Sequence, residues 1–303
     1  MSTQTVLYDI PGPKARARNR LYTVLFLLVL ALVVYFIYSG FDKKGQWAGA
    51  LWKPFVEGST WTQFLLPGLV NTLKAAALSI VIALPIGALL GVGRLSDHRW
   101  IRIPVGAVVE FFRAIPVLLL MVFAASFYAY YTGIQSDIRP LFAAVTGLVL
   151  YNGSVLAEVF RAGILSLPKG QTEASSALGL RKTQTMLNIL LPQAITLMLP
   201  ALISQLVVIL KDTALAGQLT IGYDELIRGS GPITGNFGNT IPTLIVVAII
   251  YIVLNLLLTW LASYLERKLS RRKKAPKGAK PLADAPDPVG VAAGTDMATG
   301  RGV

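Results

Sequence analysis

Several charged and polar residues lie inside long apolar stretches of the 303-residue sequence, and they are the side chains that could do chemistry. Charge within an apolar segment is costly, so such residues mark a functional site by default. The candidates for contact with a polar solute are Glu110, Arg113, Asn152, Glu158, Lys211 and Asp212. Arg113 is the strongest of them, because a guanidinium can bind a carboxylate through two parallel hydrogen bonds. The chemistry indicated is recognition of a carboxylate.

The same residues have a simpler interpretation as buried ion pairs, or as side chains that reach out of the apolar layer. Glu158 and Arg161 lie three residues apart on one predicted helix, so we expect them to pair with each other rather than to contact a solute. Lys74 is expected to reach a lipid headgroup.

Other kinds of chemistry are excluded by what the sequence lacks. It contains no cysteine and a single histidine, His98, so neither a thiolate nor a zinc site of several histidines or cysteines can form within this chain. The glycine-rich stretch 218–240 is not followed by the Gly-Lys-Ser/Thr of a phosphate-binding loop. We therefore expect no catalytic residue, no cofactor and no metal.

The composition predicts a membrane protein. The mean hydropathy is +0.62 and 54% of the residues are hydrophobic, which five or six helical spans of about 20 residues would explain. The expected fold class is all-α, a polytopic membrane protein with about six transmembrane helices. The predicted spans are 21–38, 69–93, 101–131, 141–160, 194–216 and 241–265.

Glycines and prolines modify these spans. Gly87 and Gly91 are four residues apart and permit close contact with another helix. The segment 101–131 is too long for one straight span, and Pro116 lies inside it, so we expect a break there. Pro200 is expected to interrupt the fifth span. The segment 40–66, with three tryptophans, is expected to form a loop with a short amphipathic helix.

Residues 171–194 are a polar segment between apolar runs, and their pattern predicts two helices joined by a turn. Pro168 stands near the start of the first helix, where its missing N–H does no harm. Gly179 supplies the left-handed residue that ends this helix. Thr183 is expected to cap the second helix, and Pro192 to mark a boundary before the next apolar run.

Lysine and arginine are unequally distributed between the loops. With the N-terminus inside and six spans, the inside segments hold 19 basic residues and the outside loops hold five. Cytoplasmic loops of membrane proteins carry the excess of such residues. We therefore expect both termini and the segment 171–194 in the cytoplasm. The 28 basic residues do not indicate nucleic acid as a partner, because they cluster at the ends of apolar runs.

The segment 171–194 resembles the EAA coupling loop of ABC-type importer permeases. The matching residues are Glu173, Ala174, Gly179 and the segment 189–192 that ends in Pro192. Ser175 departs from the usual pattern, since it stands where the family commonly has a second alanine.

Two further motifs are similar to the polar amino acid branch of the same family. Residues 112–116 read Phe-Arg-Ala-Ile-Pro, where that branch commonly has Phe-Arg-Gly-Thr-Pro. Residues 211–215 read Lys-Asp-Thr-Ala-Leu, close to the family's Lys-Asp-Thr-Ser-Leu. The resemblance extends over about residues 66–267.

The resemblance implies a division of the chain into segments. The permease core, of the type I importer kind, would occupy residues 67–265, with the coupling loop at 163–192. Residues 1–20 would be a cytoplasmic N-terminal segment, 21–40 an additional transmembrane helix, and 41–66 an extracytoplasmic loop. Residues 266–303 would form a cytoplasmic tail, basic at first and then disordered.

The resemblance also implies a function and partners. The chain would be the translocating subunit of an ATP-driven importer in the cytoplasmic membrane of a prokaryote, with glutamate or a related polar amino acid as its solute. Glu173, Ala174, Gly179 and Pro192 would couple it to an ABC ATPase dimer, which would hydrolyse the ATP, so the chain itself would not be an enzyme. A second permease subunit, identical or paralogous, an extracytoplasmic amino acid-binding protein and membrane lipid would be the other partners.

Other functions stay open at this point. The chain could be an ABC permease for another small polar solute, an ion-coupled carrier or channel, or a membrane-anchored assembly protein. A carrier or channel would not need the segment 173–192, and a carrier would often show inverted repeats. An assembly protein would not need polar residues inside several spans.

Overall fold

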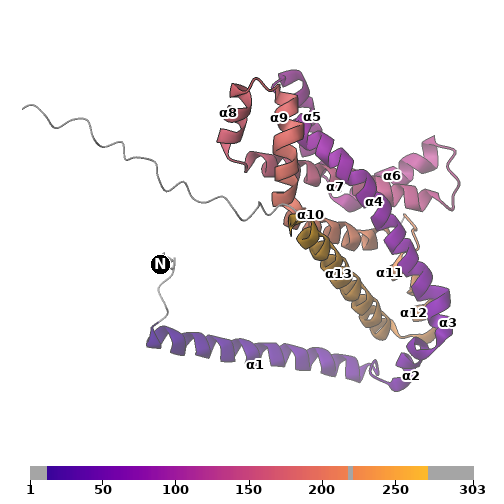
Figure 1. Cartoon of the computed structure of the whole chain (residues 1–303). Helices are drawn as coiled ribbons and strands as arrows, with labels where there is room; N and C mark the ends of the chain where they lie inside the picture. Colours follow the sequence, from indigo (N-terminus) through magenta and orange to yellow (C-terminus); the bar gives the residue numbers. More distant parts are fainter. Residues whose placement is uncertain (1–11, 218–220, 272–303) are drawn as a thin grey trace, which may run out of the picture.

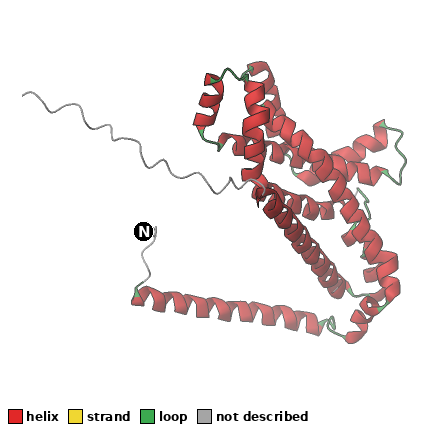
Figure 2. Cartoon of the chain, viewed as in Figure 1, coloured by secondary structure: helices red, strands yellow, loops and turns green. Residues whose placement is uncertain are grey.

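The computed structural model describes residues 12–217 and 221–271, and these residues are helical apart from short connections (Figure 2). Five of the described helices are long and apolar enough to cross a membrane, and one bent pair makes a sixth if it counts as one span. The predicted all-α fold with about six spans is therefore confirmed. The disorder predicted for the end of the tail concerns residues outside the described ranges.

The first helix, α1 (Pro13–Lys43), is longer than the predicted span 21–38 and begins with a proline, as helices often do. None of its described residues is buried, and in Figure 1 it points away from the other helices. Its apolar side chains, such as Phe26 and Phe36, are 64% exposed. At about 1.5 Å per residue it is long enough to cross a bilayer with residues to spare on both sides.

The connection from α1 to the core is a series of short turns rather than the single amphipathic helix that was expected. It consists of α2 (Gly49–Trp52), the 3₁₀ turn η1 (Lys53–Val56), α3 (Gly58–Thr60) and the π-helical turn η2 (Trp61–Leu65). Trp61 Nε1 donates a hydrogen bond to the Phe55 carbonyl at 2.8 Å, which folds the segment back on itself.

The core is built on the contact between α4 (Leu66–Gly93) and α7 (Arg139–Leu165). A Cβ on Gly87 would lie 2.6 Å from Leu156 Cβ, and one on Gly91 would lie 2.7 Å from the Ala157 carbonyl oxygen. The two backbones can approach this closely only because neither glycine has a side chain. The predicted close helix contact is confirmed.

The third predicted span is broken, as expected, into α5 (Arg99–Ala114) and α6 (Val117–Tyr131), which meet at an angle of 100°. Ile115 is extended, with φ −90° and ψ 131°, because the ring of Pro116 disfavours a helical conformation in the residue before it. Beyond the break, α6 packs on α7 at Gly147, where a Cβ would lie 2.7 Å from Met121 N.

The segment after α7 is a helical hairpin. Its first arm is α8 (Lys169–Ala177) and its second is α9 (Lys182–Thr185), which continues through the π-helical turn η3 (Met186–Leu190) into α10 (Leu191–Asp212) and the 3₁₀ turn η4 (Thr213–Gly217). Because α7 runs to Leu165, the first residues of the predicted loop 163–192 belong to that helix.

Two details of the hairpin prediction and one of the fifth span are wrong. Thr183 does not cap α9; Arg181 occupies the capping position, and its N–H is satisfied by Gln184 Oε1 at 2.9 Å. Pro192 does not mark a boundary, because one helix runs from Lys182 to Gly217. Pro200 does not interrupt that helix, although it lies inside α10.

The helix continues to Pro192 because the turn before it is wider than an α-helical turn. A proline ring would clash with the carbonyl of the fourth residue before it in a regular helix. In η3 the Leu191 N–H instead bonds the Met186 carbonyl, five residues earlier. The same arrangement occurs before Pro67, where the Leu66 N–H bonds the Trp61 carbonyl of η2.

The described part of the chain ends with α11 (Leu226–Gly229), α12 (Gly231–Phe237) and the long α13 (Thr240–Arg271). Gly238 ends α12 with φ +63°. Figure 1 shows α8 and α9 at one end of the molecule and α2, α3, α11 and α12 at the other. We call these the hairpin end and the opposite end.

Candidate functional site

The first arm of the hairpin presents an exposed surface. In α8 the side chain of Ser175 is buried, whereas Thr172, Glu173 and Ala174 are exposed. Leu178, directly after the helix, is 80% exposed. This surface, formed by α8 and Leu178 and called the α8 surface below, lies at the tip of the hairpin end and combines polar side chains, the charged Lys169 and Glu173 and an exposed leucine.

Gly179 ends this surface in the predicted way, with φ +73°. Its N–H bonds the Ser176 carbonyl at 3.0 Å and the Leu180 N–H bonds the Ser175 carbonyl at 3.1 Å. A Cβ at Gly179 would meet nothing within 4 Å. The glycine is therefore required by its backbone conformation, which costs other residues about 1 kcal/mol, and not by lack of space.

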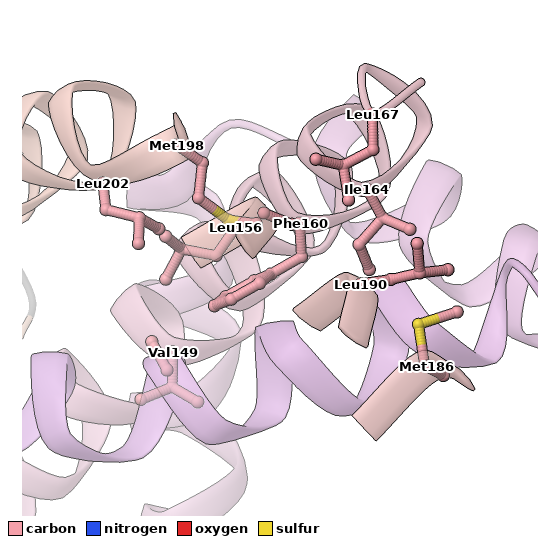
Figure 3. Close-up of a cluster of buried hydrophobic side chains, with 11 residues drawn as sticks. Val149, Leu156, Phe160, Ile164, Leu167, Met186, Leu190, Met198 and Leu202 are labelled. Carbon is pink, nitrogen blue, oxygen red and sulfur yellow. The ribbon is translucent and has the colours of Figure 1, made fainter. Parts of the chain in front are cut away.

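A group of apolar side chains fixes the second arm of the hairpin to α7, as Figure 3 shows. Met186 and Leu190 of η3 belong to the same buried cluster as Phe160 and Ile164 of α7. Met198 of α10 also belongs to this cluster. Because well-packed interiors are stiff, a displacement of the hairpin must be transmitted to α7.

An ion pair ties the hairpin to the connection between α4 and α5. Lys182 Nζ bonds the Asp97 carboxylate, and it also donates to the Leu95 carbonyl at 3.2 Å. The hydrogen bond from Lys182, followed by its charge, holds the pKa of Asp97 below its usual value. The hairpin thus contacts two elements of the core, α7 and the α4–α5 connection.

Five side chains close to the hairpin end form an arginine–glutamate network. At its centre is Arg94, the residue after α4, whose side chain is 17% exposed. Arg94 Nη2 lies 2.9 Å from Glu110 Oε1, and Arg94 Nη1 lies 2.9 Å from Glu158 Oε2. Arg161 Nη2 approaches Glu158 Oε1 at 2.6 Å, and Arg113 Nη1 approaches Glu110 Oε1 at 3.7 Å. The network joins α4, α5 and α7 and carries one more positive than negative charge.

The network brings together three of the six residues that were predicted as candidates for contact with a solute, namely Glu110, Arg113 and Glu158. The expected pairing of Glu158 with Arg161 is present. Arg113 lies next to the break between α5 and α6, as predicted, and its side chain is 36% exposed. Its partner Glu110 is more exposed, at 59%, so an arriving carboxylate could replace Glu110 at Arg113.

The other candidates lie on α7 and at the end of α10. Asn152 is buried; it donates to the Leu148 carbonyl at 3.0 Å and accepts a hydrogen bond from Gln205 Nε2 at 2.6 Å. The carboxylate of Asp212 is partly buried and faces the Asn152 side chain. Lys211 is exposed. Asn152 and Asp212 therefore form a second polar group, which includes Gln205.

A third polar group, at the opposite end, was not predicted. Glu225 is fully buried and accepts hydrogen bonds from Ile227 N at 2.8 Å, Arg228 N at 2.9 Å and the Tyr251 hydroxyl at 2.9 Å. Burial raises the pKa of Glu225 above its usual value. Burial, followed by the charge of Glu225, also raises the pKa of Tyr223 to about 12.

These contacts attach the loop before α11 to the first turns of α4. The Tyr223 hydroxyl donates to the Asn71 carbonyl at 2.8 Å, and Asn71 Nδ2 donates to the Asp224 carbonyl at 2.8 Å. The Leu226 N–H donates to Thr72 Oγ1 at 3.1 Å. The loop is therefore held by side chains of α4 and by its own buried carboxylate.

The sequence carried only weak signals for the residues that were missed. Arg94 follows an apolar span and was counted only as an orientation signal, although it is the centre of the network. Glu225 lies in the glycine-rich stretch 218–240, which the sequence indicated only to be a loop without a phosphate-binding motif. Gln205, in the middle of a predicted span, could have been included by the argument from intramembrane polarity. Among the described residues no group of three or more histidine, cysteine or acidic side chains could hold a metal ion.

Comparison with known proteins identifies the group to which these features belong. The family model described as binding-protein-dependent transport system inner membrane component matches residues 83–271. The glutamate transport system permease protein GluD of Corynebacterium glutamicum is 50% identical over 226 residues, which cover 75% of this chain and 82% of the relative. The glutamate/aspartate import permease protein GltK of Escherichia coli is 32% identical and covers 68% of this chain, with 93% of its own length matched.

Solved structures give a consistent result. A crystal structure of an amino acid ABC transporter with histidines matches with a TM-score of 0.59 and 28% identity, over 69% of this chain and 95% of the other. An inward-facing MetNI methionine ABC transporter matches with a TM-score of 0.56 and 25% identity, over 70% of this chain and 98% of the other.

Proposed function

The chain belongs to the family of binding-protein-dependent transport system inner membrane components and is a permease subunit of an amino acid ABC importer in the cell membrane, and we propose that glutamate or a closely related amino acid is its substrate. The similarity to the glutamate permease of Corynebacterium glutamicum carries this proposal, because it extends over three quarters of the chain. The excess of positive charge in the arginine–glutamate network also suits a substrate with two carboxylates.

Arg113 is the proposed contact for a substrate carboxylate. It is partly exposed and lies in the last turn of α5, at the break before Pro116. Within the described part of the chain its ion pair is the loose 3.7 Å contact with Glu110. A guanidinium held in this way can exchange one carboxylate for another at little cost, because the charge balance is unchanged. Glu110, Asn152, Glu158, Lys211 and Asp212 are proposed to line or support the same pathway.

The α8 surface is proposed to dock on an ABC ATPase subunit in the cytoplasm. The sequence contains no phosphate-binding loop, so ATP hydrolysis is assigned to that partner. Glu173 and Ala174 are exposed on this surface, Gly179 shapes its end, and Pro192 lies in the second arm. Movement of the ATPase would displace the hairpin and, through the packed cluster and Lys182, also α7 and the α4–α5 connection.

The importer is proposed to contain two permease subunits, identical or paralogous, two ATPase subunits and an extracytoplasmic binding protein. ATP binding would shift the pair of permeases between states open to either side, provided that the ATPase contacts differ between those states. An ABC permease for another small polar solute is the alternative, and substrate competition distinguishes the two. The proposal is supported if an excess of unlabelled glutamate inhibits uptake of labelled glutamate by the importer, whereas an excess of glutamine or arginine does not.

The coupling assignment is tested by copurification of the ATPase with permease variants. Glu173→Arg and Gly179→Asp should reach the membrane at normal levels, yet retain less ATPase and abolish uptake. The first reverses a charge on the α8 surface, and the second adds a charged side chain beside it.

Matched controls exist at the opposite end. Glu57→Arg reverses an exposed charge there. Gly45→Asp introduces the same side chain at a glycine with φ +64° and open surroundings, so its backbone strain is of the same kind as that of Gly179→Asp. Both controls should retain ATPase and uptake. The assignment is contradicted if a control loses as much ATPase as the hairpin variant with which it is matched. It is also contradicted if both hairpin variants retain ATPase and uptake at normal levels.

A further inference from the structure

A pocket of about 320 Å³ lies at the opposite end of the molecule, between the first turns of α4 and the loop that leads into α11. Gln63 and Asn71 line one side of it, and Asp224 and Arg228 line the other. Its volume is at the lower limit for small-molecule sites, which suits a small solute rather than a large one.

Two adjacent acidic residues have different roles at this pocket, because one side chain is buried and the other is exposed. Glu225 is fully buried, and its three hydrogen bonds fix the loop. Asp224 is 73% exposed at its side chain and faces the pocket, while its backbone carbonyl is held by Asn71 Nδ2 at 2.8 Å. The buried carboxylate thus positions the exposed one.

The floor of the pocket is backbone packed closely against backbone. A Cβ on Gly68 would lie 2.9 Å from Leu226 Cα, so α4 and α11 are in direct contact there. Gly68 and Gly229 both line the pocket. The groups that carry charge are therefore attached to a rigid base, which is what a site with defined geometry requires.

The two charged groups of the pocket have opposite sign and lie next to each other. Arg228 Nε donates to Asp224 Oδ1 at 3.0 Å, and the side chains are 43% and 73% exposed. This bond uses one of the five N–H donors of the guanidinium and one of the two carboxylate oxygens. The amide groups of Gln63 and Asn71 add neutral hydrogen-bonding partners around the pair.

We propose that this pocket binds the zwitterionic head group of an α-amino acid, with the ammonium group at Asp224 and the carboxylate at Arg228. A simple anion would be repelled by Asp224 and a simple cation by Arg228, whereas a molecule with both charges on one carbon complements both residues. The proposal rests on the proposed function in that it takes an amino acid as substrate, and it adds a first binding site at the proposed outer end of the pathway. It does not depend on which side chain the amino acid carries.

The absence of cysteine from the chain permits a direct test. Gln63→Cys introduces one thiol at the pocket, and Ser59→Cys introduces one at an exposed position of α3 outside it. The whole importer is studied in right-side-out membrane vesicles without binding protein, and the rate of thiol labelling of this chain is measured. L-Glutamate, L-alanine and glutarate are the three probes, since glutarate has two carboxylates but no ammonium group.

L-Glutamate and L-alanine should both slow labelling at Gln63→Cys, by about tenfold at a concentration of roughly nine times the Kd. Glutarate should not slow it, and none of the probes should affect labelling at Ser59→Cys. Adding Asp224→Asn or Arg228→Gln to Gln63→Cys should remove the protection. Protection by glutarate, or none by the amino acids, overturns the proposal.

Two further outcomes separate this inference from the proposed function. If added binding protein slows labelling at Gln63→Cys and free amino acids do not, the surface is a protein contact and the inference is wrong. Glutamate uptake is measured on the Ser59→Cys vesicles, whose substitution lies outside the pocket, once binding protein and ATP are supplied. If glutamate is taken up but amino acids do not slow labelling at Gln63→Cys, only the proposed pocket site is overturned. If amino acids slow labelling but glutamate is not taken up, the substrate assignment is overturned.

Discussion

Arg94 joins three helices through two carboxylates, each 2.9 Å from a different nitrogen of its guanidinium. Lysine cannot reproduce this arrangement, because an ammonium group is a point charge without a planar fork. The residue directly follows α4, and its partners lie on α5, which leads to Arg113, and on α7, which leads into the hairpin. We therefore regard Arg94 as the residue that positions Glu110 and Glu158.

Replacing Arg94 should separate assembly from transport. Arg94→Lys should reach the membrane but transport more slowly, and Arg94→Gln should also lower the Tm, because a hydrogen bond to a charged group contributes about 1.5–3 kcal/mol. Uptake and thermal unfolding of the purified complex are the measurements. Arg99→Gln, which removes an exposed arginine from the start of α5, is the control. An Arg94→Gln variant with the Tm and the uptake of this control would contradict the positioning role.

Arg113 should affect transport in a different way. Arg113→Lys should raise the substrate concentration required for half-maximal uptake and lower the maximal rate, with ATPase association unchanged, because the change removes bidentate binding of a carboxylate. Its loose contact with Glu110 makes a large loss of stability unexpected. Normal uptake kinetics in Arg113→Ala would remove this residue from the proposed pathway.

Among the described helices, the most extensive contact is between α4 and α7. The spacing of Gly87 and Gly91 predicted a close contact of α4 with another helix, without naming that helix. The break before Pro116 was foreseen from the length of the apolar run and the proline within it. Both are local signals, which a sequence carries directly. The partners of Arg94 and Glu225 could not be foreseen, since they depend on which helices become neighbours after folding. Pro192 and Pro200 were misjudged because adjacent turns can adapt to a proline.

The α4–α7 contact can be tested by a glycine-to-alanine substitution, which adds one methyl group. In Gly91→Ala the new Cβ would lie 2.7 Å from the Ala157 carbonyl oxygen and 2.8 Å from Phe160 Cβ. Overpacking of this kind typically costs about 1–3 kcal/mol, so the variant should unfold at lower temperature and transport poorly. Gly106→Ala, in α5, meets nothing within 4 Å and should be neutral or slightly stabilising. Similar Tm values for both variants would show that α4 and α7 are not in the described contact.

In the molecule as a whole, the two ends differ in what they present. The hairpin end carries the α8 surface and the network, and the opposite end carries the polar pocket above the buried Glu225. The helix α1 points away from the other helices and buries none of its described residues, which suits contact with lipid (Figure 1). The proposed function requires these ends to lie on opposite sides of the membrane.

The orientation can be established by labelling single cysteines in this cysteine-free chain. Asn236→Cys, exposed in α12, should react with a membrane-impermeant reagent added to intact cells. Thr172→Cys, exposed in α8, should react only after the membrane is permeabilised. The expectation follows from the excess of basic residues on the hairpin side. The reverse pattern would place the α8 surface away from ATP and contradict the proposed function.

The π-helical turns before Pro67 and Pro192 restrict where residues can be inserted into this chain or deleted from it. Each contains one residue more than an α-helical turn, and one residue corresponds to a rotation of about 100° around a helix. Deleting a residue between Met186 and Leu190 would convert η3 to a regular turn and rotate either α9 or all of α10 onto a different face. Insertions and deletions during evolution should therefore be rare within these turns, and a tolerated deletion should be accompanied by loss of the proline that follows.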